Sequence, residues 1–167
     1  MSLIPWASPT QTWDGENDDA FLGGFGSDFC SGDIDDPDRR HLDRAELIAI
    51  AAKRCQRCLP RGETLQKVVH VGDAPGDVLG ARALAERGLL LPRAGESTAD
   101  AAPPTRVAVG LVAVATGRYD ADELRKLAGP RVAGTWEPTV LDQGMADPRA
   151  FLDSVGIRSD ATMSDDG

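Results

Sequence analysis

Asp73 and Asp77 are the residues whose types and spacing most directly suggest chemistry, because their carboxylates lie four positions apart after a short apolar run. The run Val68-Val69-His70-Val71-Gly72 is rich in β-branched residues and predicts a buried strand with a tight exit. Pro75 suits the first turn of a following helix. Both aspartates would then face one crevice at the carboxyl end of a strand, where open α/β sheets bind ligands.

Two carboxylates in that place suit Mg²⁺, which proteins hold through one or two carboxylates together with waters and substrate phosphate. The same spacing also fits a role without a metal. Asp73 would then cap the helix, and Asp77 would be a first-turn acid favoured by the helix dipole. Spacing alone leaves both interpretations open.

A second candidate is the CxxC spacing of Cys55 and Cys58, which could form a zinc site with His41 or His70. The sequence lacks a second CxxC or a paired-histidine motif, so we do not expect zinc or redox chemistry here. With Cys30 the sequence has three cysteines, an odd number without a secretory signal ahead of them. Cysteine usage therefore fits a reducing compartment.

Apolar periodicity predicts alternating helices and strands, which is typical of a parallel sheet with right-handed crossovers. The predicted helices cover 41–59, 75–88, 120–129 and 147–155, and the predicted strands cover 68–71, 106–116 and 139–141. The nearly continuous apolar strand at 106–116 should be covered on both faces, and Thr116 should close it at the edge where Asp73 lies. Segment 89–105 is predicted to be a surface loop.

A length of 167 residues predicts one domain, over 21–157, with an N-terminal arm over 1–20 and an acidic tail over 158–167 that we expect to be disordered. The net charge of -9 argues against nucleic-acid and anionic-membrane partners. No apolar run approaches the ~20 residues of a membrane span, and the first residues do not resemble a signal peptide. We therefore expect a cytoplasmic protein.

The stretch from Val68 to Arg82 resembles the fourth motif of haloacid dehalogenase superfamily hydrolases, an apolar strand followed by GDxxxD and a helix. The resemblance is nearest to phosphoglycolate-phosphatase-like members and covers about 21–157, the C-terminal half of that fold. Segments 109–119, 139–142 and 147–152 are similar to its later strands and helices, and 24–28 followed by 43–47 resembles the part that carries its third motif. The implied fold is a three-layer, Rossmann-like parallel sheet.

The resemblance also implies roles for individual residues. Asp73 would coordinate Mg²⁺ directly, and Asp77 would bind it through water or orient the site. Arg44 takes the place of the basic third-motif residue, a catalytic position that steadies the nucleophile and the phosphate of a small phosphorylated substrate. Arg39 and Arg40 compete with Arg44 for this place, and Arg44 also fits an ordinary exposed helix residue.

The sequence departs from the family at its nucleophile, an aspartate in a DxDx[TV] motif that follows an apolar strand. Asp33-Ile34-Asp35-Asp36 has the letters DxD, but Cys30-Ser31-Gly32 before it is no strand and its order in the chain is wrong. The family's second motif, a Ser or Thr that ends a strand, is missing too. The resemblance thus predicts a truncated phosphatase-type core without its N-terminal central strand, weak or inactive alone.

An alternative is a non-catalytic binding or regulatory module. Without the central strand, the strand at 68–71 would have an unpaired edge, which invites pairing with another chain. That partner would be a second copy or a different protein, and pairing could also supply the missing aspartate strand.

Overall fold

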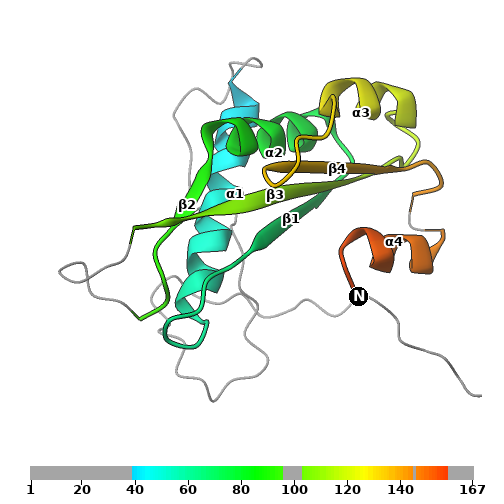
Figure 1. The fold of residues 1–167 in the computed structure, drawn as a ribbon. Helices are drawn as coiled ribbons and strands as arrows, with labels where there is room; N and C mark the ends of the chain where they lie inside the picture. The colour runs from blue at the N-terminus through cyan, green and yellow to red at the C-terminus, as the bar shows by residue number, and fades with distance from the viewer. Residues whose placement is uncertain (1–38, 96–102, 145, 158–167) are drawn as a thin grey trace, which may run out of the picture.

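Helices and strands alternate through residues 39–95, 103–144 and 146–157, the part of the chain that this computed structural model describes (Figure 1). The elements in order are α1 (Arg40–Arg57), β1 (Lys67–Gly72), α2 (Pro75–Arg87), β2 (Leu89–Leu91), β3 (Thr105–Val114), α3 (Ala121–Ala128), β4 (Trp136–Leu141) and α4 (Pro148–Ser154). The α/β class is confirmed. The predictions for 1–20, 24–28, Cys30, 33–36 and 158–167 fall outside the described residues.

Strand β3 is the centre of a mixed sheet of four strands. It pairs in parallel with β1 on one edge and with β4 on the other, so the parallel arrangement predicted for these three strands is confirmed. The carboxyl ends of β1 and β3 therefore lie side by side, with Gly72 opposite Ala113.

The prediction of a wholly parallel sheet is wrong at β2, which lies in the segment predicted to be a loop. β2 pairs antiparallel with the start of β3, with Leu89 opposite Val107 and Leu91 opposite Thr105. Gly88 has a positive φ of 85° and turns the chain directly out of α2 into this strand. The three residues of β2 are too few to show the alternating pattern that predicts a strand, and the Gly- and Pro-rich segment that follows them predicts a loop.

One face of the sheet carries the main core. Alternate residues of β3 point toward α2, and α1 packs against α2 to complete the cluster. Its fully buried members include Val109, Leu111, Val78, Leu84, Ala49 and Leu124. A Cβ atom on Gly80 would lie 2.7 Å from the Cβ of Arg44, so the absence of a side chain lets α1 and α2 come together at this point.

The opposite face is more open. Val112 and Val114 of β3 are buried on it, as predicted for a strand covered on both sides, but Val71 of the neighbouring β1 is 41% exposed. Figure 1 shows α4 on this side of the sheet, across from α2 and α3. At the other end of this face, Lys67 forms an ion pair with Glu137, with 2.5 Å between Nζ and Oε2.

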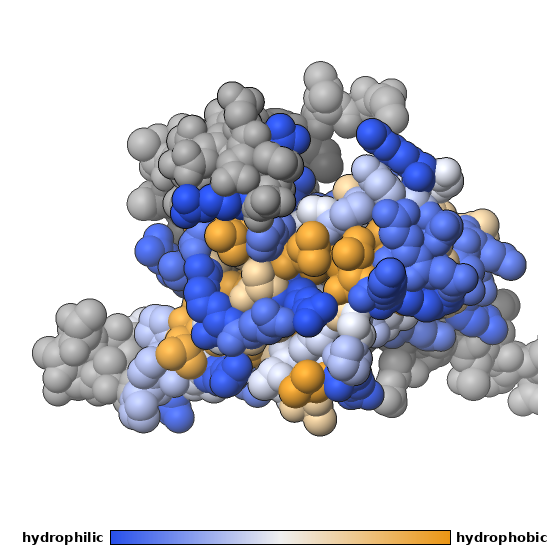
Figure 2. All heavy atoms as spheres, turned by 90° about the horizontal axis from the view of Figure 1, so that it is seen from above, coloured by the Kyte–Doolittle hydropathy of each residue, from blue (hydrophilic) through white to orange (hydrophobic). Residues whose placement is uncertain are grey.

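Hydrophilic side chains cover much of the surface seen from above in Figure 2, with apolar side chains in patches between them. None of the helices in the described ranges is both long and apolar enough to cross a membrane.

Candidate functional site

Asp73 lies at the carboxyl edge of the sheet, directly after β1. The hydroxyl of Thr116, just beyond β3, donates a hydrogen bond of 2.8 Å to Oδ2 of Asp73. Parallel pairing of β1 with β3 brings the two residues together, as the sequence predicted for this edge. The predicted cap by Asp73 is wrong, because the N-cap of α2 is Ala74. Asp73 therefore presents an exposed carboxylate that one hydroxyl orients.

Asp77, by contrast, is buried in the first turn of α2 and binds three groups. Its Oδ1 lies 2.9 Å from Nε of Arg44 and 3.4 Å from Nε2 of His70. Its Oδ2 accepts a hydrogen bond of 3.3 Å from the backbone N–H of Ala74. Asp77 thus joins α1, β1 and the start of α2, and it is the first-turn acid that the spacing suggested.

The surroundings of Asp77 keep it ionised. Burial acts to raise the pKa of this carboxyl, but the hydrogen bond with His70, the charge of Arg44 and the N–H of Ala74 together hold the pKa below its ordinary value. An ionised Asp77 gives Arg44 a fixed anionic partner at neutral pH.

Arg44 is the member of the predicted arginine set that contacts Asp77. Its side chain is 48% exposed, and the close approach of α1 to Gly80 places it over α2. Arg39 is the N-cap of α1 and Arg40 its first residue, one turn before Arg44. Arg44 is thus an exposed helix residue, as one of the two interpretations expected, and its guanidinium also forms an ion pair with a buried carboxylate.

The contact of His70 with Asp77 is the feature of this site that the sequence reasoning missed. The sequence analysis names His70 only as a possible zinc ligand, whereas the contact follows from strand parity. Val68 and His70 occupy alternate positions of β1, so they share the face that packs against α2. The usable signal was therefore that the one polar residue on the inward face of β1 needs a polar partner.

The described residues do not bear out a zinc site at the CxxC pair. They contain no group of three or more His, Cys, Asp or Glu side chains that could hold a metal ion. The Cys58 thiol donates to the Arg54 carbonyl oxygen at 3.3 Å. Burial, together with the nearby Cys58, raises the pKa of the Cys55 thiol. This environment favours the protonated thiol over the thiolate that zinc requires.

Magnesium makes a different demand, because it keeps several waters and needs as few as one protein carboxylate when a substrate phosphate completes its coordination. Asp73 meets that demand, since it is exposed and Thr116 fixes its orientation. Asp77 fits a supporting place, because its charge is already shared with Arg44 and His70. The arrangement is thus compatible with a weak, substrate-assisted Mg²⁺ site.

Chemically, this edge combines an exposed carboxylate, a hydroxyl and a half-exposed guanidinium that is fixed by a buried aspartate. Such a set can bind a hydrated cation and an anionic oxygen together. In comparisons with known proteins, no family, no curated protein and no solved structure matches this chain.

Proposed function

We propose that this chain is a Mg²⁺- and phosphate-binding core of the haloacid dehalogenase type, with the site of a phosphomonoester phosphatase but weak or no turnover by itself. The observation that carries the proposal is the ion pair of Arg44 with Asp77, which lies four residues after Asp73. Arg44 comes from α1 and Asp77 from the first turn of α2, and their ion pair supports the proposal because it holds α1 against the start of the helix that follows Asp73.

Each residue has a distinct part in the proposed site. Asp73 would hold Mg²⁺, with Thr116 fixing the direction of its carboxylate. The metal, when bound, neutralises charge on a phosphate oxygen. Arg44 uses Nε for Asp77, and its Nη groups are suited to a second phosphate oxygen. Asp77 positions Arg44 and ties α2 to β1 rather than contacting the substrate.

The proposed lack of turnover follows from the missing nucleophile motif. Covalent phosphoryl transfer of this type needs an attacking carboxylate, and a metal or an arginine stabilises charge without replacing it. The printed sequence contains no DxDx[TV] motif after an apolar strand.

The test is a titration of the protein with MgCl₂ and then inorganic phosphate, followed by ¹H–¹⁵N NMR. We expect saturable shifts at residues 72–77 and 116–117, which Asp73→Asn abolishes. Asp153→Asn, an exposed aspartate of α4, is the matched control and should leave the shifts unchanged. Mg²⁺ shifts that persist in Asp73→Asn would contradict the metal role.

A parallel assay follows hydrolysis of p-nitrophenyl phosphate with and without Mg²⁺. We expect no turnover above the Asp73→Ala variant. Metal-dependent turnover that this variant loses would overturn the proposed inactivity, and it would point to a nucleophile elsewhere in the chain.

The alternative function, a module that pairs through its sheet edge, is favoured by β1. Among the described residues β1 pairs only with β3, and its Val71 is 41% exposed. The Ala108 N–H donates a hydrogen bond to the Gln66 carbonyl oxygen. In a parallel ladder every second residue of a strand bonds to the same neighbour, so the backbone groups of Val68 and His70 face β3. The N–H of Val69 therefore points away from β3, toward the outer edge of β1. Such an edge can accept a strand from a second copy.

Val69→Pro tests this alternative, because proline removes a donor only from the outer edge of β1. If copies pair there, light scattering should show a concentration-dependent dimer for the wild type and a monomer for Val69→Pro. A wild type that stays monomeric over the whole concentration range would rule out pairing with itself.

A further inference from the structure

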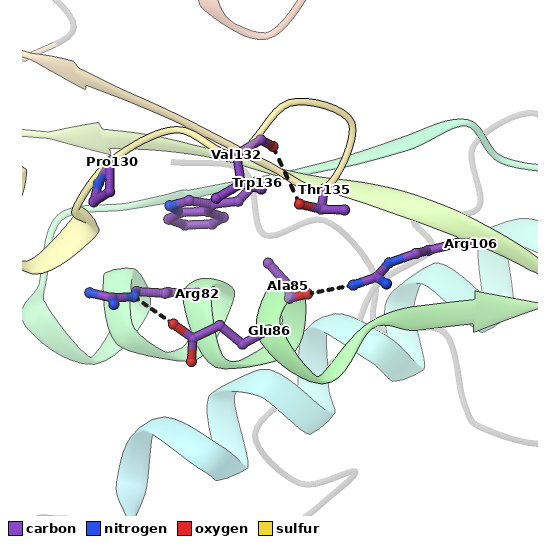
Figure 3. A pocket seen from close by; sticks show the side chains of 8 residues that line it. All are labelled: Arg82, Ala85, Glu86, Arg106, Pro130, Val132, Thr135 and Trp136. Atoms are coloured by element: carbon purple, nitrogen blue, oxygen red, sulfur yellow. Dashed lines mark hydrogen bonds and ion pairs between the residues drawn. The ribbon is translucent and has the colours of Figure 1, made fainter.

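We propose that a pocket between α2 and the segment leading into β4 binds a small aromatic monocarboxylate. The pocket has a volume of about 220 Å³. Arg82, Glu86 and Arg106 lie along one wall, and Val132 and Trp136 lie along the other (Figure 3). Arg106 is near the start of β3 and Thr116 is beyond its end, so the Arg106 end of the pocket lies roughly 30 Å along the strand from the edge that holds Asp73, at ~3.3 Å per strand residue. It is therefore separate from the proposed phosphate site.

The wall formed by Trp136 is rigid and apolar. The indole is 4% exposed, and its Nε1–H donates a hydrogen bond of 3.0 Å to the carbonyl oxygen of Ala128. Beside it, Val132 is 52% exposed and leaves apolar surface open to solvent. A flat ring inserted here would cover Val132 and pack against a side chain that is already ordered, which keeps the entropic cost of binding low.

The opposite wall supplies the positive charge. Arg82 is held on two sides, with its Nε 2.9 Å from Oε1 of Glu86 and its Nη1 donating to the Leu127 carbonyl oxygen at 3.1 Å. Arg106 makes one long hydrogen bond of 3.4 Å, from Nη2 to the Ala85 carbonyl oxygen, and no carboxylate of the described residues pairs with it. Its guanidinium is therefore available to bind a carboxylate through two parallel hydrogen bonds.

Charge and shape together select the ligand class. Arg82 and Arg106 against Glu86 leave one net positive charge, on a chain whose total is -9. One positive charge balances a carboxylate and underbalances a phosphate dianion. Figure 3 shows the two arginines at opposite ends of the wall with Ala85 and Glu86 between them, so a carboxylate at Arg106 leaves the ring over Ala85 and against Trp136.

The test is a titration with 1-naphthoate, followed through the indole N–H resonance of Trp136 in ¹H–¹⁵N NMR. Trp136→Phe assigns that resonance among the three tryptophans of the chain. Acetate lacks the ring contact, and 1-naphthalenemethanol lacks the charge-assisted contact with Arg106. Each should therefore bind at least about tenfold more weakly than 1-naphthoate.

Two substitutions locate the binding. Arg106→Gln removes the proposed carboxylate partner and should weaken 1-naphthoate at least about tenfold. Val132→Glu places a negative charge at the exposed rim and should weaken it too, without touching the core. Arg149→Gln, an exposed arginine of α4, is the matched control and should change nothing.

Equal binding of 1-naphthalenemethanol, or unchanged affinity in Arg106→Gln, would overturn the proposal. Tighter binding of 1-naphthyl phosphate than of 1-naphthoate would overturn the assignment to a monocarboxylate. Asp73→Asn should leave 1-naphthoate binding intact, so the result is independent of the proposed phosphate site.

Discussion

Gly72 lies directly against Asp77, so that a Cβ atom on Gly72 would be 2.4 Å from the Cβ of Asp77 and 2.5 Å from its Cγ. The last residue of β1 and the first turn of α2 can therefore come into contact only because Gly72 has no side chain. This contact holds Asp77 within reach of both His70 and Arg44. The glycine of the GDxxxD stretch is thus a packing requirement of the site as well as a turn residue.

Gly72→Ala should destabilise the fold, because neither the rigid Cβ of Asp77 nor the strand can move away freely. We expect the free energy of unfolding to fall by about 1–3 kcal/mol, as for other overpacked positions. Gly76→Ala is the control, since a Cβ there meets nothing within 4 Å. It should be neutral or stabilise α2 by up to about 1 kcal/mol. Urea unfolding followed by circular dichroism measures both, and equal effects of the two substitutions would contradict the packing argument.

The alternation of elements could be predicted because each long element carries its own local signal. Pro75 marks the first residue of α2, and β-branched runs mark β1 and β3. β4 begins at Trp136, three residues before its predicted start at 139. Pro138 obscures this strand in the sequence, yet a strand at the edge of the described sheet tolerates it.

The candidate site likewise has features that the sequence predicts and features that it does not. Asp73, Asp77 and Thr116 could be placed at one edge because the carboxyl ends of neighbouring parallel strands meet there. The pairing of His70 with Asp77 depends on which face of β1 is covered, and the pocket of Arg106 and Trp136 depends on tertiary packing. Strand parity offers a signal for the first of these, whereas no local period in the sequence encodes the second, because Arg106 and Trp136 belong to different strands.

The ionised state of Asp77 predicts a loss of stability in acid. Burial opposes ionisation, but His70, Arg44 and the Ala74 N–H lower the pKa of Asp77 in the folded protein below its ordinary value of 3.8. The unfolded state therefore binds the proton more readily, so Asp77 stabilises the fold above pH ~4 and this contribution is lost as the pH falls through the folded-state pKa.

Unfolding of the wild type and of Asp77→Asn between pH 6 and pH 2.5 measures this contribution. The difference in the free energy of unfolding should be largest at the upper end and shrink below pH ~4. Asn keeps the size of the side chain and removes its charge. A difference that stays constant across this range would show that the charge of Asp77 does not stabilise the fold.

Helix caps should matter unequally, because α3 is anchored in the core and α4 is not. Asp120 accepts a hydrogen bond of 2.7 Å from the N–H of Glu123, and α3 buries Leu124 completely. Asp147 caps α4 through two N–H groups at 3.0 Å, but α4 buries none of its residues. Asp120→Ala should therefore lower the global free energy of unfolding by about 1 kcal/mol.

Asp147→Ala should instead open α4 locally and leave the global value unchanged, since a helix without buried residues can unfold on its own. Amide hydrogen exchange separates the two cases. Asp120→Ala should speed exchange at the slowest core amides of β3, whereas Asp147→Ala should speed it only within 148–154. Faster exchange in β3 after Asp147→Ala would show that α4 unfolds together with the sheet, and the open face beside Val71 would then be part of one cooperative unit.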